Sequence, residues 1–242
     1  MGKTAAAVNL AYLASREGSR EGSAVLLCDL DPQGAASFYL RVRSSKKYRA
    51  RHLLDDDKKV AKNIKGTDFE QLDVLPAALS YRNLDIRLEG KKHSKSRLQE
   101  VLQPLQKEYH YIFLDCPPNL TLVSENIFLA ADLILLPVIP TTLSMLSYQK
   151  LTRFFEKHHY DPDKLIGFFS MVEIRKKLHR QSIEPTSHHQ LRFLQSQIPY
   201  SAEVERMGLT RRPLVESRPP AGASLAYGRL WQEVKTILKK IN

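Results

Sequence analysis

The chain has 242 residues, of which 43% are hydrophobic and 26% are charged, and this ordinary globular composition argues against intrinsic disorder. No apolar stretch approaches the roughly 20 residues that span a bilayer, and no signal-like segment opens the chain, so we expect a cytoplasmic protein without integral membrane association. The 37 Lys and Arg exceed the 26 Asp and Glu and leave a net charge of +11, which favours polyanionic partners, although a scattered solvated surface explains it equally well.

The chain opens with Gly2, Lys3 and Thr4, and a helical pattern over residues 4–17 follows directly. These three residues match the closing half of the phosphate-binding loop G-x-x-x-x-G-K-[ST]. In that loop, backbone N–H groups at a helix N-terminus hold phosphate oxygens, the Lys ammonium reaches the β- and γ-phosphates, and the Thr hydroxyl binds Mg²⁺. The triplet alone is weak evidence, because it arises by chance in many chains.

Short apolar runs predict buried strands at residues 24–30, 72–76, 111–116, 133–138 and 165–172. Helical patterns alternate with these runs, at residues 4–17, 95–107 and 146–158. The alternation indicates an α/β fold with a mostly parallel sheet and helices on both faces, and the length fits a single domain over residues 1–242. Ligands bind at the carboxyl ends of the strands in such a sheet.

Acidic residues fall at those carboxyl ends. Asp29 and Asp31 follow the first predicted strand, and Asp115 closes the third. Because side chains alternate along a strand, we expect Asp29 and Asp31 to face the same side and to approach a metal–phosphate site together. Asp115 has the position of a Walker B carboxylate, which holds Mg²⁺ through water. One acid at a strand end is as often a cap or turn former, but three of them together with Lys3 favour a nucleotide site.

Other segments carry weaker signals. Residues 41–66 are rich in Arg, Lys and Asp and are expected to be an exposed excursion, and residues 88–96 a loop before a helix. The last segment, 225–241, has apolar residues along one face and is expected to be an amphipathic helix docked on the sheet rather than a membrane-binding tail. Cys28 and Cys116 lie in apolar runs and are expected to be buried thiols in a reducing compartment.

Several motifs carry a resemblance to a known family: Gly2-Lys3-Thr4 followed by AVNLA, DLDPQG from Asp29 to Gly34, and DCPP from Asp115 to Pro118. In order and spacing they resemble the ParA/Soj group of deviant Walker-A partitioning ATPases, with an N-terminal truncation. The segments IPYSAEVERMG, PLVES and GASLAYGRLWQEV are similar to that group's ending, so the resemblance covers nearly the whole chain. It implies a P-loop NTPase fold of the ParA/MinD type without its first strand.

The resemblance also implies an activity. ATP binding forms a homodimer, the dimer binds DNA without sequence preference, and hydrolysis of ATP to ADP and phosphate, stimulated by a ParB-like partner, releases it. Such an ATPase partitions plasmid or chromosomal DNA and is found on the nucleoid in the cytoplasm.

The roles implied by the resemblance fall on matching positions of this chain. Lys3 would neutralise phosphate charge, and Thr4 would bind Mg²⁺. Asp115 would hold Mg²⁺ through water, Asp31 would position the attacking water, and Asp29 would support the metal site. The residues next to the nucleotide would be Gly2, Lys3, Thr4, Asp115 and Pro117.

One part of the family pattern is absent. The family's loop reads K-G-G-x-G-K-T after a buried strand, whereas Met1 here occupies the x position. Either the start was assigned at an internal Met of a complete gene, or the chain is a remnant that no longer hydrolyses ATP. The first is favoured, because a missing central strand removes several side chains worth about 1.5–3 kcal/mol each, against a domain stability of roughly 5–15 kcal/mol. We therefore expect poor solubility and no ATP turnover for the chain as written, and an upstream extension to restore both.

Nonspecific DNA binding needs Lys and Arg that neutralise phosphates. The resemblance places them in the C-terminal third, where the candidates are Arg175, Lys176, Arg211, Arg212 and Arg218. Two other functions stay open: a MinD-like membrane-cycling ATPase, which only the last helix supports, and a degenerate DNA-binding or scaffold protein without hydrolysis, which fits the incomplete loop. An iron–sulfur relative fits poorly, because neither cysteine has a cluster-ligand setting.

Overall fold

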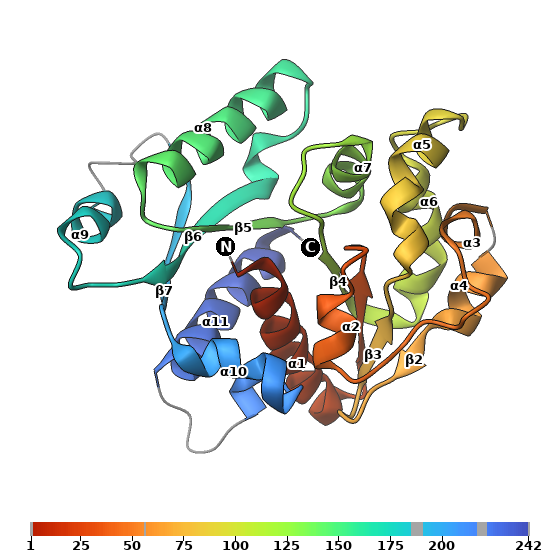
Figure 1. Ribbon diagram of the computed structural model, residues 1–242, viewed down its shortest axis with the longest axis horizontal. Helices are drawn as coiled ribbons and strands as arrows, with labels where there is room; N and C mark the ends of the chain where they lie inside the picture. The colour runs from red at the N-terminus through yellow and green to blue at the C-terminus, as the bar shows by residue number, and fades with distance from the viewer. Residues whose placement is uncertain (1, 56, 185–190, 217–221, 242) are drawn as a thin grey trace. The chain divides into compact units, whose positions relative to one another are not determined.

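The computed structural model describes residues 2–55, 57–184, 191–216 and 222–241 (Figure 1). The chain divides into two compact units. We call one the carboxylate unit, because it contains Asp29, Asp31 and Asp115; it consists of Ala7–Ala130 and Met207–Pro213. The other, which contains Lys3, is the lysine unit; it consists of Met1–Ala6, Ala131–Arg206 and Leu214–Asn242.

The sheet of the carboxylate unit has the strand order β2-β3-β1-β4 (Figure 1). β1 (Ala24–Asp29) lies between β3 (Leu72–Leu75) and β4 (Tyr109–Asp115) and is parallel to both. β2 (Lys65–Gly66) is short and pairs with β3 in the antiparallel direction. Nearly every residue of β1 is buried, as expected of a central parallel strand with an unbroken apolar run.

Helices and short 3₁₀ segments connect these strands. α1 (Lys3–Glu21) precedes β1, and the others are α2 (Ala35–Tyr39), α3 (Ala50–Asp55), α4 (Asp57–Asn63), η1 (Leu79–Asn83), α5 (Leu84–Glu89), α6 (Arg97–Leu102), η2 (Gln103–Lys107) and α7 (Leu122–Ala130). Leu26 of β1 belongs to one hydrophobic core with Leu53 of α3, Leu98 of α6 and Val123 of α7. One core therefore unites β1 with helices that lie both near to it and far from it in the sequence.

The segment between α2 and β3 is folded, so the expectation of an exposed excursion over residues 41–66 is wrong. It contains α3 and α4, and Tyr48, Leu53, Leu54 and Val60 are buried in it. Most of the basic residues between them stay at the surface. The high charge of the segment reflects its outer side, whereas the apolar residues between the charges turn inward and pack.

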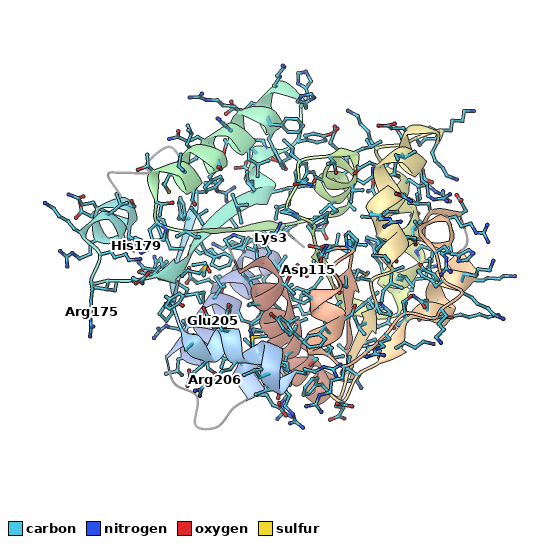
Figure 2. All side chains as sticks on the ribbon, viewed as in Figure 1. Lys3, Asp115, Arg175, His179, Glu205 and Arg206 are labelled. Atoms are coloured by element: carbon cyan, nitrogen blue, oxygen red, sulfur yellow. The ribbon has the colours of Figure 1, made fainter. Side chains whose placement is uncertain are left out.

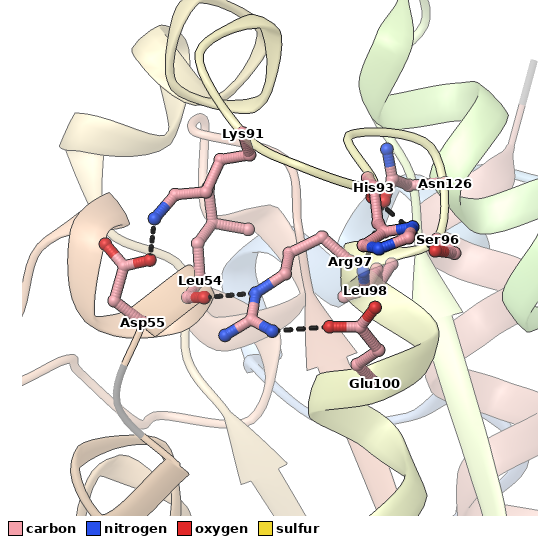
Figure 3. Close-up of polar contacts among 9 residues, drawn as sticks. All are labelled: Leu54, Asp55, Lys91, His93, Ser96, Arg97, Leu98, Glu100 and Asn126. Atoms are coloured by element: carbon pink, nitrogen blue, oxygen red, sulfur yellow. Dashed lines mark hydrogen bonds and ion pairs between the residues drawn. The ribbon is translucent and has the colours of Figure 1, made fainter.

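The polar stretch between α5 and α6 is a loop, as expected, and side-chain contacts fix it (Figure 3). Asn126 Nδ2 donates to the Ser94 carbonyl at 2.6 Å, and Asn126 Oδ1 accepts from Leu98 N at 3.1 Å. Arg97 Nε donates to the Leu54 carbonyl at 2.6 Å. The buried Asn126 amide thus satisfies one backbone group of the loop and one at the start of α6, and Arg97 links the start of α6 to α3.

The sheet of the lysine unit has the strand order β5-β6-β7 (Figure 1). β6 (Leu165–Val172) is parallel to both β5 (Ile134–Val138) and β7 (Phe193–Pro199). Besides α1, the described helical segments that begin in this unit are α8 (Thr142–Lys157), η3 (Pro162–Lys164), α9 (Lys177–Ile183), α10 (Ala202–Thr210), η5 (Leu214–Glu216) and α11 (Ala223–Ile241). A Cβ at Gly167 of β6 would come within 2.7 Å of the Tyr148 ring, so close packing of α8 on the sheet requires glycine there.

α11 packs against β7, which confirms the expectation that the last helix docks on the sheet. Leu230, Trp231 and Val234 are buried along its apolar face. The Glu233 carboxylate also accepts hydrogen bonds from the backbone N–H groups of Gln195 and Ser196, both at 2.7 Å. The apolar face that would make a membrane-binding tail is therefore used for internal packing.

The α/β class and the mostly parallel pairing are confirmed. The five predicted strands are present as β1, β3, β4, β5 and β6, whereas β2 and β7 were not anticipated. Among the described residues, β4 pairs only with β1, and β5 pairs only with β6. Ile112 and Phe113 of β4 are only half-buried.

Within the part of the chain that the structure describes, no helix combines the length and the apolar character that crossing a membrane requires.

Candidate functional site

Asp29 and Asp115 lie next to each other at the carboxyl ends of β1 and β4. They are register partners on the two parallel strands, and Leu30 N donates to the Asp115 carbonyl at 2.9 Å. Asp29 is 0% exposed and Asp115 is 1% exposed. Carboxylates removed from water in this way require a cation, a bound proton or hydrogen-bond donors to offset their charge.

The start of α2 holds Asp29 through one of its two carboxylate oxygens. Asp29 Oδ2 accepts hydrogen bonds from Ser37 N at 2.7 Å and from Ser37 Oγ at 2.6 Å. Ser37 Oγ accepts in turn from Ala77 N at 3.0 Å. Asp29 Oδ1 is buried and has no hydrogen-bond partner among the described residues. A buried carboxylate oxygen without a donor suits a cation or a water bound to one.

Burial raises the pKa of the Asp29 carboxyl above its ordinary value. The hydrogen bonds from Ser37 oppose this rise in the pKa without cancelling it. The negative charge of Asp31 adds to the rise, and the backbone N–H of Asp31 opposes it by a smaller amount. Burial also raises the pKa of the half-buried Tyr39 hydroxyl, with a further contribution from the charge of Asp115. Negative charge is thus concentrated at these two strand ends, and a divalent cation would relieve it.

Replacing Asp29 by asparagine is expected to stabilise the metal-free protein at neutral pH. A raised native pKa gives stability that is present below the unfolded pKa of about 3.9 and is lost as the pH rises through the native pKa. Asparagine carries no charge to bury, so the gain should be about 1–3 kcal/mol at pH 7 and should shrink toward about pH 4. Thermal unfolding of both proteins across this pH range measures it.

The comparison is Asp31→Asn, whose side-chain oxygen can still accept from Gln33 N and which should gain less stability than Asp29→Asn, because it removes only the smaller contribution of the Asp31 charge. If Asp29→Asn is instead less stable at every pH, the second oxygen of Asp29 has a donor and is not available to a cation.

Asp31 lies in the turn that leads from β1 into α2. β1 ends at Asp29, so Asp31 lies outside the strand. The alternation of side chains along a strand therefore does not determine which way Asp31 faces, and the use of that alternation to orient Asp31 was wrong. Asp31 Oδ1 accepts from Gln33 N, and the Asp31 carbonyl accepts from Gly34 N, both at 2.9 Å. Gly34 has a φ of +66°, which costs glycine less than any other residue. In this turn Asp31 is half-buried and follows Asp29 after a single residue, Leu30.

The chain leaves β4 through Cys116 and Pro117, which are both half-buried. The expectation of a buried Cys116 within a strand is wrong, because β4 ends at Asp115, and Cys116 Sγ donates to the Leu114 carbonyl at 3.3 Å. Cys28 is buried in β1 as expected, and burial, together with the charge of the neighbouring carboxyl, raises the pKa of its thiol. Cys28 is therefore an inert core residue.

Gly2, Lys3 and Thr4 lie together at the start of α1, in the lysine unit. Gly2 has a φ of +84°, and a Cβ there would come within 3.0 Å of Ser170 Oγ on β6. The Gly2 carbonyl accepts from Ala6 N at 2.9 Å, so the helix is well formed from its first turn. That turn contains no acidic residue, and the first N–H groups of a helix have no acceptor within it. This helix end therefore suits an anion such as a phosphate.

The donor set suits Mg²⁺ better than a metal held by protein side chains alone. Among the residues described, no three His, Cys, Asp or Glu side chains are arranged to hold a metal ion. Proteins usually bind Mg²⁺ through one or two carboxylates, while substrate phosphates and waters supply the other ligands. Asp29 and Asp115 provide hard oxygen donors of this kind.

Arg175 and Lys176 lie on the turn between β6 and α9 and are exposed; Figure 2 shows the side chain of Arg175 pointing away from the ribbon. Lys176 forms an ion pair with Glu173, which contributes little at an exposed position. His179, which Figure 2 also labels, is buried, and its Nδ1 accepts from Glu173 N at 3.1 Å. The turn thus presents positive charge on an ordered support.

Arg211 is tied to the protein in a way that sequence reasoning did not anticipate. Its Nε donates to the Phe38 carbonyl at 3.0 Å, and its guanidinium carbon lies 4.6 Å from the centre of the Phe38 ring. The Arg211 carbonyl accepts from Arg41 Nε at 3.2 Å. A substitution at Arg211 would therefore disturb local structure as well as charge. Arg212 is exposed, and Arg218 lies outside the described residues.

Sequence reasoning did not single out Ser37, although its amide and hydroxyl both hold Asp29 and its oxygen holds Ala77 N. The sequence feature that could have indicated Ser37 is its position shortly after Gly34. A small hydroxyl residue in the first turn of a helix that follows a glycine turn is well placed to bond a nearby carboxylate.

Comparison with known proteins identifies a family and similar proteins. Residues 1–165 match the family described as AAA domain. Sporulation initiation inhibitor protein Soj of Bacillus subtilis strain 168 is 29% identical over 241 residues, which cover 97% of the chain and 93% of that protein. Chromosome partitioning protein ParA of Myxococcus xanthus strain DK1622 is 32% identical over 193 residues, which cover 76% of the chain and 65% of that protein.

Among solved structures, cobyrinic acid a,c-diamide synthase from Mycobacterium smegmatis with bound ATP analog and magnesium has a TM-score of 0.78 and 20% sequence identity. The match covers 98% of the chain and 91% of that protein. At this identity the likeness shows the fold alone, and it agrees with the α/β arrangement described above.

Proposed function

The chain belongs to the ParA/Soj-like family of AAA-domain ATPases, and on this premise we propose that it partitions plasmid or chromosomal DNA through ATP-dependent dimerisation and nonspecific DNA binding. It would act as one P-loop ATPase domain over residues 1–242, and hydrolysis of ATP to ADP and phosphate would require the first half of the phosphate-binding loop as well as Gly2, Lys3 and Thr4. A ParB-like protein would stimulate hydrolysis, and the protein would work on the nucleoid.

The single observation that carries the nucleotide part of the proposal is the pair of buried carboxylates at the ends of β1 and β4. Asp29 and Asp115 are in register, and Asp29 Oδ1 has no hydrogen-bond partner among the described residues. Burial of such groups is destabilising, and it persists in proteins where function requires it. Binding of Mg²⁺ is a function that would explain why these two carboxylates are buried although their burial destabilises the protein.

Individual residues would contribute by position and charge. Lys3 would donate to phosphate oxygens, Thr4 would bind Mg²⁺ through its hydroxyl, and Asp115 would hold Mg²⁺ through water. Asp31, on the turn after β1, would orient the attacking water, and the carboxylate of Asp29 would support the metal site. Mg²⁺ supplies electrostatic stabilisation of the phosphate charge when it is bound.

The DNA-binding part of the proposal is supported by the net charge of +11 and by the exposed turn with Arg175 and Lys176. Arg and Lys on the surface neutralise phosphates and release counterions from DNA, so affinity falls as salt rises. The membrane-cycling alternative loses its support, because the apolar face of α11 is buried on β7 through Leu230, Trp231 and Val234.

Binding to labelled duplex DNA of arbitrary sequence, with and without Mg²⁺–ATP and at several salt concentrations, tests the proposal. We expect binding to need ATP. Arg175→Gln/Lys176→Gln should weaken it and lower the slope of log affinity against log salt by about 0.9 for each phosphate that is no longer neutralised. The matched control, Lys150→Gln/Arg153→Gln, removes the same charge from exposed positions of α8 and should leave the slope unchanged.

Three outcomes would count against parts of the proposal. Equal slopes for both double variants would remove the turn before α9 from the DNA-binding surface. DNA binding without any ATP turnover by a chain that carries the complete phosphate-binding loop, in the presence of an activating partner, would favour the non-hydrolysing DNA-binding alternative. Binding to anionic vesicles but not to DNA would favour the membrane-cycling alternative.

A further inference from the structure

The carboxylate unit contains a cavity of about 660 Å³ that the proposed function does not use. Its wall is formed by the turn after β1, the segment between α2 and α3, the residues that follow β3, and Arg211. Asp29, Asp31 and Asp115 do not line it. The volume falls within the range of about 300–1,000 Å³ that is typical of small-molecule sites.

Four arginines line this cavity: Arg43, Arg49, Arg82 and Arg211. None of the described residues that line it is acidic. Like charges placed around one concave space repel each other and destabilise the empty protein. A bound anion would remove that repulsion, so the chemistry of the wall selects a negatively charged ligand.

Two of these arginines are held in place by the protein. Arg49 Nη1 donates to the Tyr48 carbonyl at 2.9 Å, and Arg211 is fixed by its hydrogen bond to the Phe38 carbonyl and by the Phe38 ring. Held guanidinium groups lose little further freedom when they bind, which favours affinity.

The other two arginines are available to a ligand. The guanidinium groups of Arg43 and Arg82 have no hydrogen-bond or ion-pair partner among the described residues, and both residues are exposed. Each guanidinium presents a planar fork of N–H donors that matches two oxygens of a phosphate group. The wall also contains the side-chain amides of Gln33 and Asn83, which can bind further oxygens.

We propose that this cavity binds a small molecule that carries a cluster of phosphate groups. Four positive charges around so small a volume match a ligand with several negative charges close together, as in a di- or triphosphate. An acidic peptide with as many carboxylates would extend over several residues at about 3.3 Å each and would not fit the same concave space. A DNA duplex presents its phosphates on a convex surface, which cannot enter the cavity.

The cavity is connected to the carboxylates through one residue. Ser37 lines the cavity and also donates to Asp29 Oδ2 from both its amide and its hydroxyl. A ligand in the cavity would therefore contact the element that holds Asp29. The inference goes beyond the proposed function and does not rest on it, because binding here requires neither ATP hydrolysis nor DNA.

Calorimetric titration with sodium pyrophosphate and with inorganic tripolyphosphate, without Mg²⁺, tests the proposal. The titrations use the full chain with Lys3→Ala, so that the start of α1 does not contribute. We expect binding that Arg43→Gln/Arg82→Gln weakens at least about tenfold, since the variant loses two guanidinium groups that can donate charge-assisted hydrogen bonds to phosphate oxygens. The matched control, Arg16→Gln/Arg87→Gln, removes the same charge from exposed positions outside the cavity and should change affinity less than about twofold.

A further variant keeps the test decisive if the double variant does not fold. Arg82→Lys keeps the charge but loses the planar fork, and it should weaken binding by an intermediate amount. Absence of pyrophosphate and tripolyphosphate binding, or equal weakening by the cavity and control pairs, would overturn the proposal. Equally tight binding of a glutamate peptide would show an acidic-peptide site instead. Loss of duplex binding in Arg43→Gln/Arg82→Gln with unchanged oligophosphate binding would assign these arginines to DNA.

Discussion

Replacing Lys3 by alanine is expected to weaken the binding of Mg²⁺–ATP by about 10- to 100-fold, because each charge-assisted hydrogen bond to phosphate contributes about 1.5–3 kcal/mol. Lys3 lies in the first turn of α1, next to Gly2, whose φ of +84° sets the entry into the helix. A lysine at this position adds a positive charge to the N–H groups of the helix end. Equilibrium titration with a fluorescent ATP analog measures the loss of affinity without requiring turnover.

Lys150→Ala is the matched control, because this lysine is exposed on α8 in the same unit and its replacement should leave nucleotide affinity unchanged. If Lys3→Ala and Lys150→Ala bind the analog equally well, the Gly-Lys-Thr triplet does not contact phosphate. The nucleotide part of the proposed function would then rest on the carboxylates alone.

Replacing Trp231 by alanine is expected to destabilise the protein by about 3–5 kcal/mol. Trp231 is 1% exposed on the face of α11 that packs against β7. Its removal leaves a cavity that the rigid strand cannot fill, and the protein forfeits both the buried apolar area and the dispersion attraction of the indole ring. For a chain of this length the change corresponds to a fall in melting temperature of at least about 6 °C.

Gln232→Ala is the control for this prediction, since the neighbouring side chain is exposed on the same helix. Urea unfolding followed by circular dichroism compares the three proteins. A decrease in unfolding free energy below about 1 kcal/mol for Trp231→Ala would mean that the indole ring does not hold α11 in place. The helix would then be available to a partner, and the membrane alternative would regain support.

Local patterns predicted much of the fold. β1, β3, β4, β5 and β6 come from unbroken apolar runs, which a strand buried on both faces requires. β7 escaped prediction because its burial alternates: Leu194, Ser196 and Ile198 are buried, whereas Gln195 between them is exposed. A serine in the core and a glutamine outside break both the continuous and the alternating apolar pattern.

For residues 41–66 the sequence pattern predicted an exposed segment, whereas the structure shows two packed helices. The prediction rested on the many charged residues of this segment. Charged residues indicate only that one side of a segment faces water, and the other side can still be buried. Leu53, Leu54 and Val60 supply the buried side of α3 and α4, and they are few enough to be hidden by the surrounding charges in a composition count. Only the packing of these helices against α5 and α6 shows that the segment belongs to the core.

By itself the sequence singled out the groups that we propose carry the chemistry: the Gly-Lys-Thr triplet before a helix, and the acids at the ends of two buried strands. These signals are local, because a strand, a turn and a helix start each depend on a few neighbouring residues. The tertiary structure alone decided that Ser37 holds one oxygen of Asp29 and that Arg43, Arg82 and Arg211 surround one cavity. Arg211 and Phe38 are 173 positions apart, and contacts of that kind arise from the packing of whole elements, which no short pattern encodes.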